Sequence, residues 1–152
     1  TTGAWCWYNN DSATYWMYGK LYNWYAVNDS RGLAPQGWHI PSDAEWTSIS
    51  TCVGGDAASG GAMKEAGTTH WTSPNTAATN SSGFTGLPGG FRDGNSNGAF
   101  SLVSVYGGFW SSTADPLHYS NAWYRYLYYI AANIYIAYYG YNNGFSVRCV
   151  RD

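Results

Sequence analysis

The feature that most constrains this chain is a run of tyrosines near the C-terminus that occupy alternate positions. Residues 119–141 contain nine tyrosines and one charged residue, Arg125. Over residues 123–128 the order is Trp, Tyr, Arg, Tyr, Leu, Tyr, so the tyrosines share one face of a strand. Residues 133–138 alternate again, with isoleucines on one face and tyrosine and alanine on the other. The pattern predicts two strands that each have one ordinary core face and one tyrosine face.

The tyrosine face is larger than a core of this size can absorb. A buried tyrosine needs a hydrogen-bond partner for its hydroxyl, and a chain of 152 residues builds a single core. We therefore expect most of these tyrosines at the surface, as an aromatic patch rimmed by Asn and Gly that marks a binding surface. Rigid Tyr rings among small residues are typical of an antibody paratope. The alternative is a sheet face covered by the long middle segment.

Two helices are predicted ahead of the strands. Residues 18–27 place apolar side chains at i, i+3 and i+4, which is one helix face, and residues 28–32 end it. Ser42 and Glu45 have the spacing of a capping box and begin a second helix, which the glycines at 54 and 55 end. The apolar stripe of this second helix consists of Trp46, Ile49 and Val53.

The middle of the chain, from about residue 54 to 100, is rich in Gly, Ser, Thr, Asn and Ala. We expect a long loop there, with at most one turn of helix at 62–66. The side chains expected to pin this loop to the core are Trp71, Phe84, Leu87, Phe91 and Phe100. Strands follow, and residues 145–150 are expected to form the last one. Two helices packed on a mostly antiparallel sheet predict an α+β fold, in a single domain over residues 1–152.

The small number of charges excludes several classes of protein. Seven basic and nine acidic residues give a net charge of −2, so we expect no nucleic-acid partner and no anionic membrane partner. With 11% charged and 19% aromatic residues, the chain is neither disordered nor a coiled coil. The uncharged run of 126–147 is too polar for membrane insertion. The first residues lack the pattern of a signal peptide, which we expect to be absent or already removed.

The three cysteines fit no zinc pattern and allow at most one intrachain pair. If a pair forms, Cys6 and Cys149 are favoured, because chain ends often lie close together. Cys52 occupies an apolar position of the second predicted helix, so we expect it to be buried. Cysteine usage weakly favours an extracellular location.

The residues that could support catalysis or metal binding follow no known pattern. Residues 93–97 have oxygen ligands at alternate positions but no closing Glu, and we interpret them as a turn. No Gly-x-Ser-x-Gly elbow accompanies the histidines, which we expect to be hydrogen-bonded loop or core residues. Arg125 and Arg148 are expected to bond backbone carbonyls or a carboxylate beneath the binding face. We expect no catalytic residue, no metal and no cofactor, so the chain is not predicted to be an enzyme. The histidines are His39, His70 and His118.

Five ordered motifs resemble a known family over nearly the whole chain. They are residues 19–27 (GKLYNWYAV), 37–46 (GWHIPSDAEW), 83–92 (GFTGLPGGFR), 109–113 (FWSST) and 144–150 (GFSVRCV). Together they resemble the Fibrobacter succinogenes major paralogous domain. The resemblance implies a C-type lectin-like fold, of the same branch as the formylglycine-generating enzyme. The paired active-site cysteines of that enzyme are not matched, and the calcium-dependent sugar motifs of C-type lectins do not occur.

Some members of this family are variable proteins of diversity-generating retroelements. In these, a reverse transcriptase copies a template with errors at adenines and rewrites codons near the C-terminus. Where the family has Asn, this chain has mostly Tyr, Ile, Ala and Gly, which adenine changes in an Asn codon can produce. Such changes cannot produce Lys, Glu, Gln, Met or Trp, and none of these occurs over residues 124–144. The family positions that this chain keeps are Ala122, Trp123, Tyr124, Arg125 and Leu127.

The resemblance implies a variable ligand-binding segment at about 115–142, anchored by Trp123, Leu127 and Ile134. It would recognise an unknown protein or glycan, outside the cell, on a bacterial surface or a virion. The alternative is an undiversified extracellular module of the same family with a fixed carbohydrate- or protein-binding site. A homo-oligomer and a fusion to a display module both stay open. The predicted ligand-binding residues are Tyr124, Tyr126, Tyr128, Ile130, Ala131, Asn133, Tyr135, Ala137, Tyr138, Tyr139, Gly140 and Tyr141.

Overall fold

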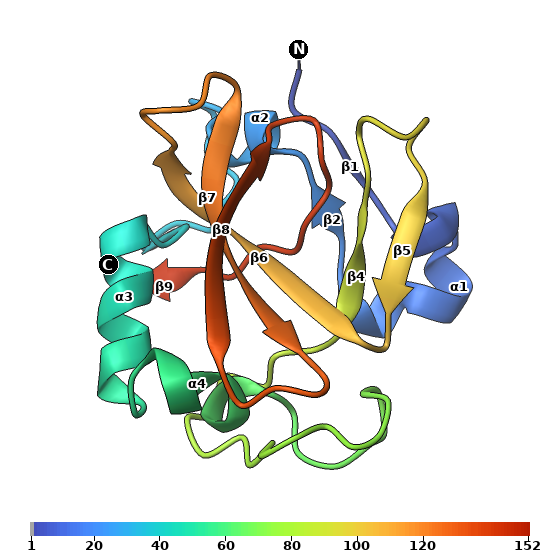
Figure 1. Cartoon of the computed structure of the whole chain (residues 1–152). Coiled ribbons are helices and arrows are strands. Elements are labelled where there is room, and N and C mark those ends of the chain that lie inside the picture. The colour runs from blue at the N-terminus through green and yellow to red at the C-terminus, as the bar shows by residue number, and fades with distance from the viewer. Residues whose placement is uncertain (1) are drawn as a thin grey trace.

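The computed structural model describes residues 2–152 and has the predicted α+β architecture around a five-stranded sheet (Figure 1). In spatial order its strands are β5 (Phe100–Val103), β4 (Gly89–Arg92), β6 (Tyr106–Ala114), β7 (Asn121–Tyr128) and β8 (Ile134–Gly140). All neighbours are antiparallel except β4 and β6. Two small sheets join distant segments: β1 (Trp5–Cys6) with β2 (Leu21–Tyr22), and β3 (Trp38–His39) with β9 (Val150–Arg151).

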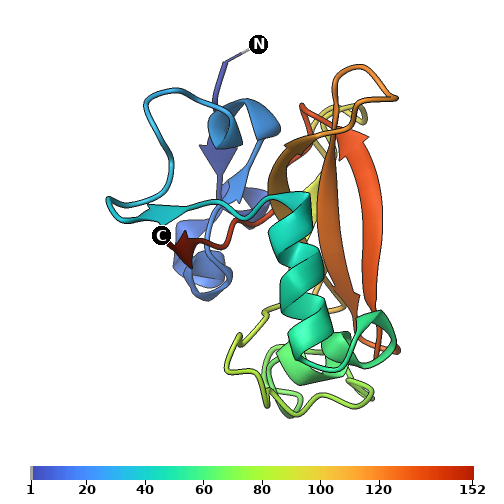
Figure 2. The same ribbon diagram turned by 90° about the vertical axis from the view of Figure 1, so that its left-hand side faces the viewer.

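The helices are short, and the longest is the one predicted from the capping box. The α-helices are α1 (Ser12–Tyr15), α2 (Trp24–Val27), α3 (Asp43–Cys52) and α4 (Asp56–Met63), and 3-10 turns span Tyr8–Asn10 and Trp16–Tyr18. The Ser42 hydroxyl accepts from the Glu45 amide, and the Glu45 carboxylate accepts from the Ser42 amide at 2.8 Å. Figure 2 shows α3 running along the sheet, where it contacts β6 and β7, with α4 at its lower end against β8.

The first predicted helix is wrong over its first half. Residues 21–22 form strand β2, which pairs with β1, and only Trp24–Val27 is helical. The Asn23 side chain accepts hydrogen bonds from the amides of Ala4 and Ala26, at 2.8 and 3.0 Å. This cap starts the helix at residue 24, so the apolar spacing before it belongs to a strand.

The expected loop after residue 54 contains helix α4, and the helix turn expected at 62–66 is wrong because α4 ends at Met63. Gly60 and Gly61 lie inside α4, and glycine is unfavourable in a helix. Their role is close packing. A Cβ at Gly60 would clash with the carbonyl of Asn133, and one at Gly61 with the carbonyl of Ala77.

Two apolar clusters lie on the two faces of the sheet. Leu127 and Ile134, two predicted anchors, are buried in a cluster with Trp46, Met63 and Trp71, while the third, Trp123, is partly buried. Much of the middle segment therefore covers the face opposite the tyrosines. The second cluster lies on the tyrosine face and comprises Trp24, Val27, Ile40, Tyr106, Trp110, Ala122, Tyr124 and Phe145.

The C-terminal segment and the cysteines differ from expectation. Residues 145–150 make isolated bridges at Phe145 and Ser146 and pair as a strand only in β9, because the segment crosses between two sheets. Cys52 is exposed at the end of α3, and Cys6 and Cys149 are not paired. Residues 2–152 contain no apolar helix of membrane-spanning length.

Candidate functional site

The tyrosine face is built by the register of three neighbouring strands. Tyr126 on β7 stands opposite Tyr135 on β8, and Tyr128 on β7 stands opposite Tyr106 on β6. Directly opposed residues of antiparallel strands project from the same face. Tyr139 is opposed to Ala122 and joins the same face. The period-two pattern of the sequence therefore assigns these side chains to the correct face.

The rings on this face stack in a continuous ladder. The Tyr126 ring lies 4.7 Å from the Tyr135 ring and 5.1 Å from the Tyr106 ring, with interplanar angles of 10° and 24°. Further in, the Tyr124 ring stacks on Phe145 at 4.5 Å and 8°. Stacked rings stabilise one another by about 0.5–1.5 kcal/mol per pair beyond the burial of their surface. The ladder holds its outer rings in fixed positions.

The outer rings border an open groove of about 450 Å³, which we call the tyrosine groove. Its described lining residues carry no charge, and tyrosine hydroxyls are its side-chain polar groups. Burial raises the pKa of Tyr106, Tyr124 and Tyr126, so these hydroxyls keep their protons at neutral pH. The groove can bind through ring area and hydroxyl hydrogen bonds. Its lining residues are Phe91, Leu102, Tyr106, Tyr124, Tyr126, Tyr128, Tyr135, Tyr139 and Phe145.

The expectation that most of the nine tyrosines lie at the surface is wrong. Tyr119, Tyr138 and Tyr139 are exposed, Tyr124 is buried, and the other five are half-buried. The reason is contact between neighbouring rings. Tyr126 and Tyr135 stack on each other, Tyr141 stacks on Trp24, and Tyr128 meets Tyr129 edge-on. Tyrosines thus form the floor and walls of a groove instead of an open patch.

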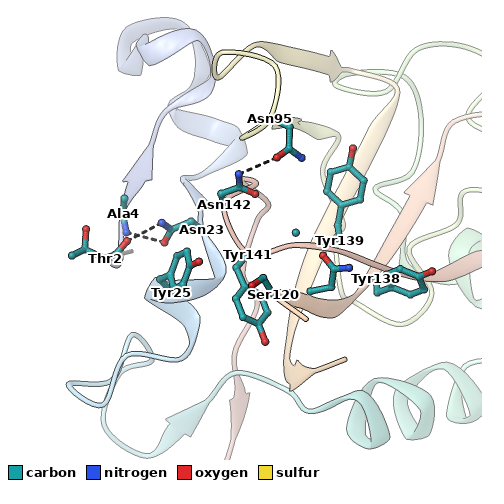
Figure 3. A pocket seen from close by; sticks show the side chains of 12 residues that line it. Thr2, Ala4, Asn23, Tyr25, Asn95, Ser120, Tyr138, Tyr139, Tyr141 and Asn142 are labelled. Carbon is teal, nitrogen blue, oxygen red and sulfur yellow. Dashed lines mark hydrogen bonds between the residues drawn. The ribbon is translucent and has the colours of Figure 1, made fainter. Parts of the chain in front are cut away.

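A second, more polar hollow lies beside the groove and shares Tyr139 with it (Figure 3). We call it the amide cleft; its volume is about 980 Å³. Asn142 donates to the Asn95 side-chain oxygen across it at 3.1 Å. Asn23 caps α2 at its edge. Its lining residues are Thr2, Ala4, Asn23, Tyr25, Asn95, Ser120, Asn121, Tyr138, Tyr139, Gly140, Tyr141 and Asn142.

The structure distributes the twelve predicted ligand-binding residues over four places. The tyrosine groove receives Tyr124, Tyr126, Tyr128, Tyr135 and Tyr139. The amide cleft receives Tyr138, Gly140 and Tyr141, and Tyr139 again. Ala137 packs against the apolar cluster on the tyrosine face. The turn between β7 and β8 carries Ile130, Ala131 and Asn133, away from both hollows.

Sequence reasoning missed the residues that other segments bring to these hollows. Phe91, Leu102 and Tyr106 complete the groove. Asn23 and Asn95 reach the cleft from segments far away in sequence. No local pattern marks these residues, because contacts between segments far apart in the sequence bring them there, such as β4 with β6 and Tyr22 with Phe145.

Lys64 was also missed, and it fixes the turn between β7 and β8. Its side chain is fully buried, and Nζ donates to the carbonyls of Thr76, Tyr128 and Ala131 at 2.9, 3.1 and 2.8 Å. Burial lowers the pKa of Lys64 to about 8. The Gly61 amide donates to the carbonyl of Ala132 at 2.8 Å. These contacts reach main-chain atoms of the turn, so they do not depend on its side chains.

Both predicted scaffold arginines are confirmed. Arg125 is buried on the face opposite the tyrosines, where it donates to the Asp43 carboxylate at 2.6 Å and the Thr47 hydroxyl at 3.2 Å. Arg148 donates to the carbonyls of Phe84 and Thr85 at 2.9 and 3.0 Å. Each ties the sheet region to a neighbouring segment.

The histidines are hydrogen-bonded, as predicted, and each is held by a carboxylate. His39 contacts Glu45 and Asp152 at 2.7 Å each, and these hydrogen bonds raise its pKa. His70 contacts Glu65 at 2.8 Å. His118 contacts Asp115 at 2.6 Å and the Tyr138 hydroxyl at 3.3 Å. Among the described residues, none of these imidazoles is hydrogen-bonded to a serine or cysteine.

The segment 93–97 is a turn, as predicted. The Asp93 carboxylate accepts from the Asn95 amide and the Ser96 hydroxyl, at 2.8 Å each. These bonds also lower the pKa of Asp93. Over residues 2–152, no three His, Cys, Asp or Glu side chains come close enough to hold a metal ion together.

Comparison with known proteins gives one match. The model of the Fibrobacter succinogenes major domain matches residues 1–151. Neither a search of curated proteins nor a search of solved structures returned a match.

Proposed function

Because this chain belongs to the Fibrobacter succinogenes major domain family, we propose that it is a ligand-binding protein diversified by a retroelement reverse transcriptase. The tyrosine groove and its rim would be the hypervariable surface, and the fold would be C-type lectin-like. One observation carries the proposal: apart from the buried Tyr124, the β7–β8 hairpin is held mainly through its backbone and inward side chains. Its groove-facing side chains are left to contact a ligand.

The inward side of the hairpin supports this division. Leu127 and Ile134 are buried, and Arg125 is tied to α3. Lys64 and Gly61 hold the turn by its carbonyls. Replacing a groove-facing residue would remove none of these contacts.

The outward side supports it as well. Within the described part of the chain, the hydroxyls of Tyr126, Tyr128 and Tyr135 make no hydrogen bond to another protein group. Tyrosine rings in binding sites supply contact area at low entropic cost, and their hydroxyls form hydrogen bonds that orient the ligand. The proposed ligand is a macromolecule on a cell surface or another exposed target, and the proposed mechanism is binding without turnover.

The location follows the same proposal. A diversified binding surface acts on targets outside the cell, so we propose a bacterial surface or a virion as its site. The charge of −2 gives no attraction to nucleic acid.

Sequencing the codons for residues 115–152 across the natural population tests the proposal. We expect substitutions at the groove and rim codons, especially 126, 128, 135 and 138–140, and they should trace to template adenines. The codons for Arg125, Leu127 and 144–149 should stay constant. Uniform codons throughout would reject diversification and leave an undiversified module with a fixed binding site.

A further inference from the structure

We propose that the amide cleft binds a neutral saccharide, such as the terminal pyranose of a glycan. The inference rests on the proposed function in one respect. Tyr138, Tyr139, Gly140 and Tyr141 belong both to the cleft and to the segment proposed to vary, so the specificity would be that of this particular sequence.

The polar groups of the cleft match hydroxyls better than ions. None of its described lining residues is charged. The side-chain NH₂ of Asn95 and both polar atoms of the Asn121 side chain have no partner within residues 2–152. An asparagine amide donates and accepts, as a sugar hydroxyl does. A charged ligand would lose its hydration there without gaining an opposite charge.

Aromatic rings border the cleft and are held rigidly. Tyr141 stacks on Trp24 at 4.3 Å and 17°, and meets the edge of Tyr25 at 5.6 Å. Tyr139 is 37% exposed and meets Phe145 edge-on at 5.9 Å. The C–H faces of a pyranose pack well on the negative face of an aromatic ring. In Figure 3, Tyr139 lies on one side of the cleft, with Tyr25 and Tyr141 on the other.

Gly140 leaves room for the ligand among the amides. Its backbone φ is not in the left-handed region, so the chain conformation does not require glycine. A Cβ at this position would lie 3.0 Å from Asn142 Oδ1 and 3.6 Å from Asn121 Oδ1. The missing side chain therefore keeps both amides open to the cleft. The cleft volume of about 980 Å³ lies within the range of small-molecule sites.

The test is an NMR titration of the ¹⁵N-labelled chain with methyl α-mannopyranoside, methyl β-galactopyranoside and N-acetylglucosamine. We expect at least one of them to shift the side-chain amide signals of Asn95, Asn121 and Asn142 saturably. The signal of Asn28, an exposed asparagine outside the cleft, should not move. N121A and N142A should each weaken binding by about tenfold. The matched variant N28A should not change it.

Three results would overturn the proposal. The first is the absence of a saturable shift with every neutral sugar. The second comes from parallel titrations with glucuronate and methyl glucoside, and it is tighter binding of the charged glucuronate. The third is saturation of the same amides by N-acetylglycinamide but not by sugars, which would make the cleft a peptide site. A Y126A/Y135A variant separates the proposals: it should disable the groove and leave the sugar-induced shifts intact.

Discussion

At the scale of single residues, local spacing predicts a side chain's partner when both partners are near in sequence or share a helix. The Ser42–Glu45 capping box was predictable because three residues separate its members. The burial of Cys52 was predicted wrongly, because the face of α3 that packs on the core carries Trp46, Ile49 and Val53, and Cys52 lies outside that face. Lys64 was not predictable at all: its three acceptors come from two other segments.

Lys64 yields the first prediction. K64M keeps the length of the side chain but removes all three hydrogen bonds. The carbonyls of Thr76 and Ala131 lose their partner, whereas the carbonyl of Tyr128 still accepts from the Ala131 amide at 3.2 Å. Each lost partner costs about 1–3 kcal/mol, so we expect the free energy of unfolding to fall by roughly 3 kcal/mol or more. Urea denaturation measures it. K20M is the matched control, because Lys20 lies over the Trp5 ring and its side chain donates no hydrogen bond to a carbonyl of residues 2–152; it should cost at most about 1 kcal/mol. Equal losses in both variants would contradict the role given to Lys64.

At the scale of elements, the spacing of apolar residues predicts a helix or strand correctly when one of its faces is buried along its whole length. β7 and β8 follow their alternating pattern, and α3 follows its capping box. Residues 18–27 carry helical spacing, but Leu21–Tyr22 form β2, because a strand partner from the N-terminal segment competes with the local preference. The sequence did not predict α4, because its close packing requires Gly60 and Gly61, and glycines are typical of loops. Composition therefore predicts a loop wherever tight contacts select small residues.

The tyrosine ladder yields a prediction at this scale. Tyr124 is 7% exposed at the floor of the groove, whereas Tyr135 is half-buried on the edge strand β8. We expect Y124A to lower the free energy of unfolding by about 3–5 kcal/mol, as for a buried aromatic. Y135A loses mainly one stack with Tyr126 and should cost about 1 kcal/mol. Thermal and urea unfolding of both variants measure the difference; similar losses would show that the outer rings are core residues.

At the scale of the whole molecule, the sequence predicts which residues face the site better than it predicts the shape of the site. The alternation in β7 and β8 places five predicted tyrosines in the groove. Phe91, Leu102 and Tyr106 form the opposite side of the groove, and the β4–β6 contact brings them close to the tyrosines of β7 and β8. The amide cleft needs the N-terminal segment and the turn at Asn95 as well. Such long-range pairing leaves no trace in local patterns.

The division between scaffold and groove yields the last prediction. Consider a library in which residues 126, 128, 135 and 139 carry only amino acids that adenine changes in Asn codons can produce. Contacts from other elements hold the hairpin backbone, and these four rings are only partly buried. We therefore expect each substitution to cost about 1 kcal/mol, near the lower end of the range for single substitutions, and most members to fold. A matched library varies Trp123, Arg125, Leu127 and Ile134 over the same amino acids. Three of those four are buried, so we expect most of its members to unfold.

Protease resistance of displayed members, measured across both libraries, decides between two views of the hairpin. If the groove library survives and the anchor library does not, side-chain identity in the groove is free to serve binding. If both libraries lose folded members at the same frequency, the tyrosine ladder itself holds the hairpin, and the chain could not accept the variation that the proposed function requires. Comparing libraries of equal size and chemistry removes the general cost of replacing large residues with small ones.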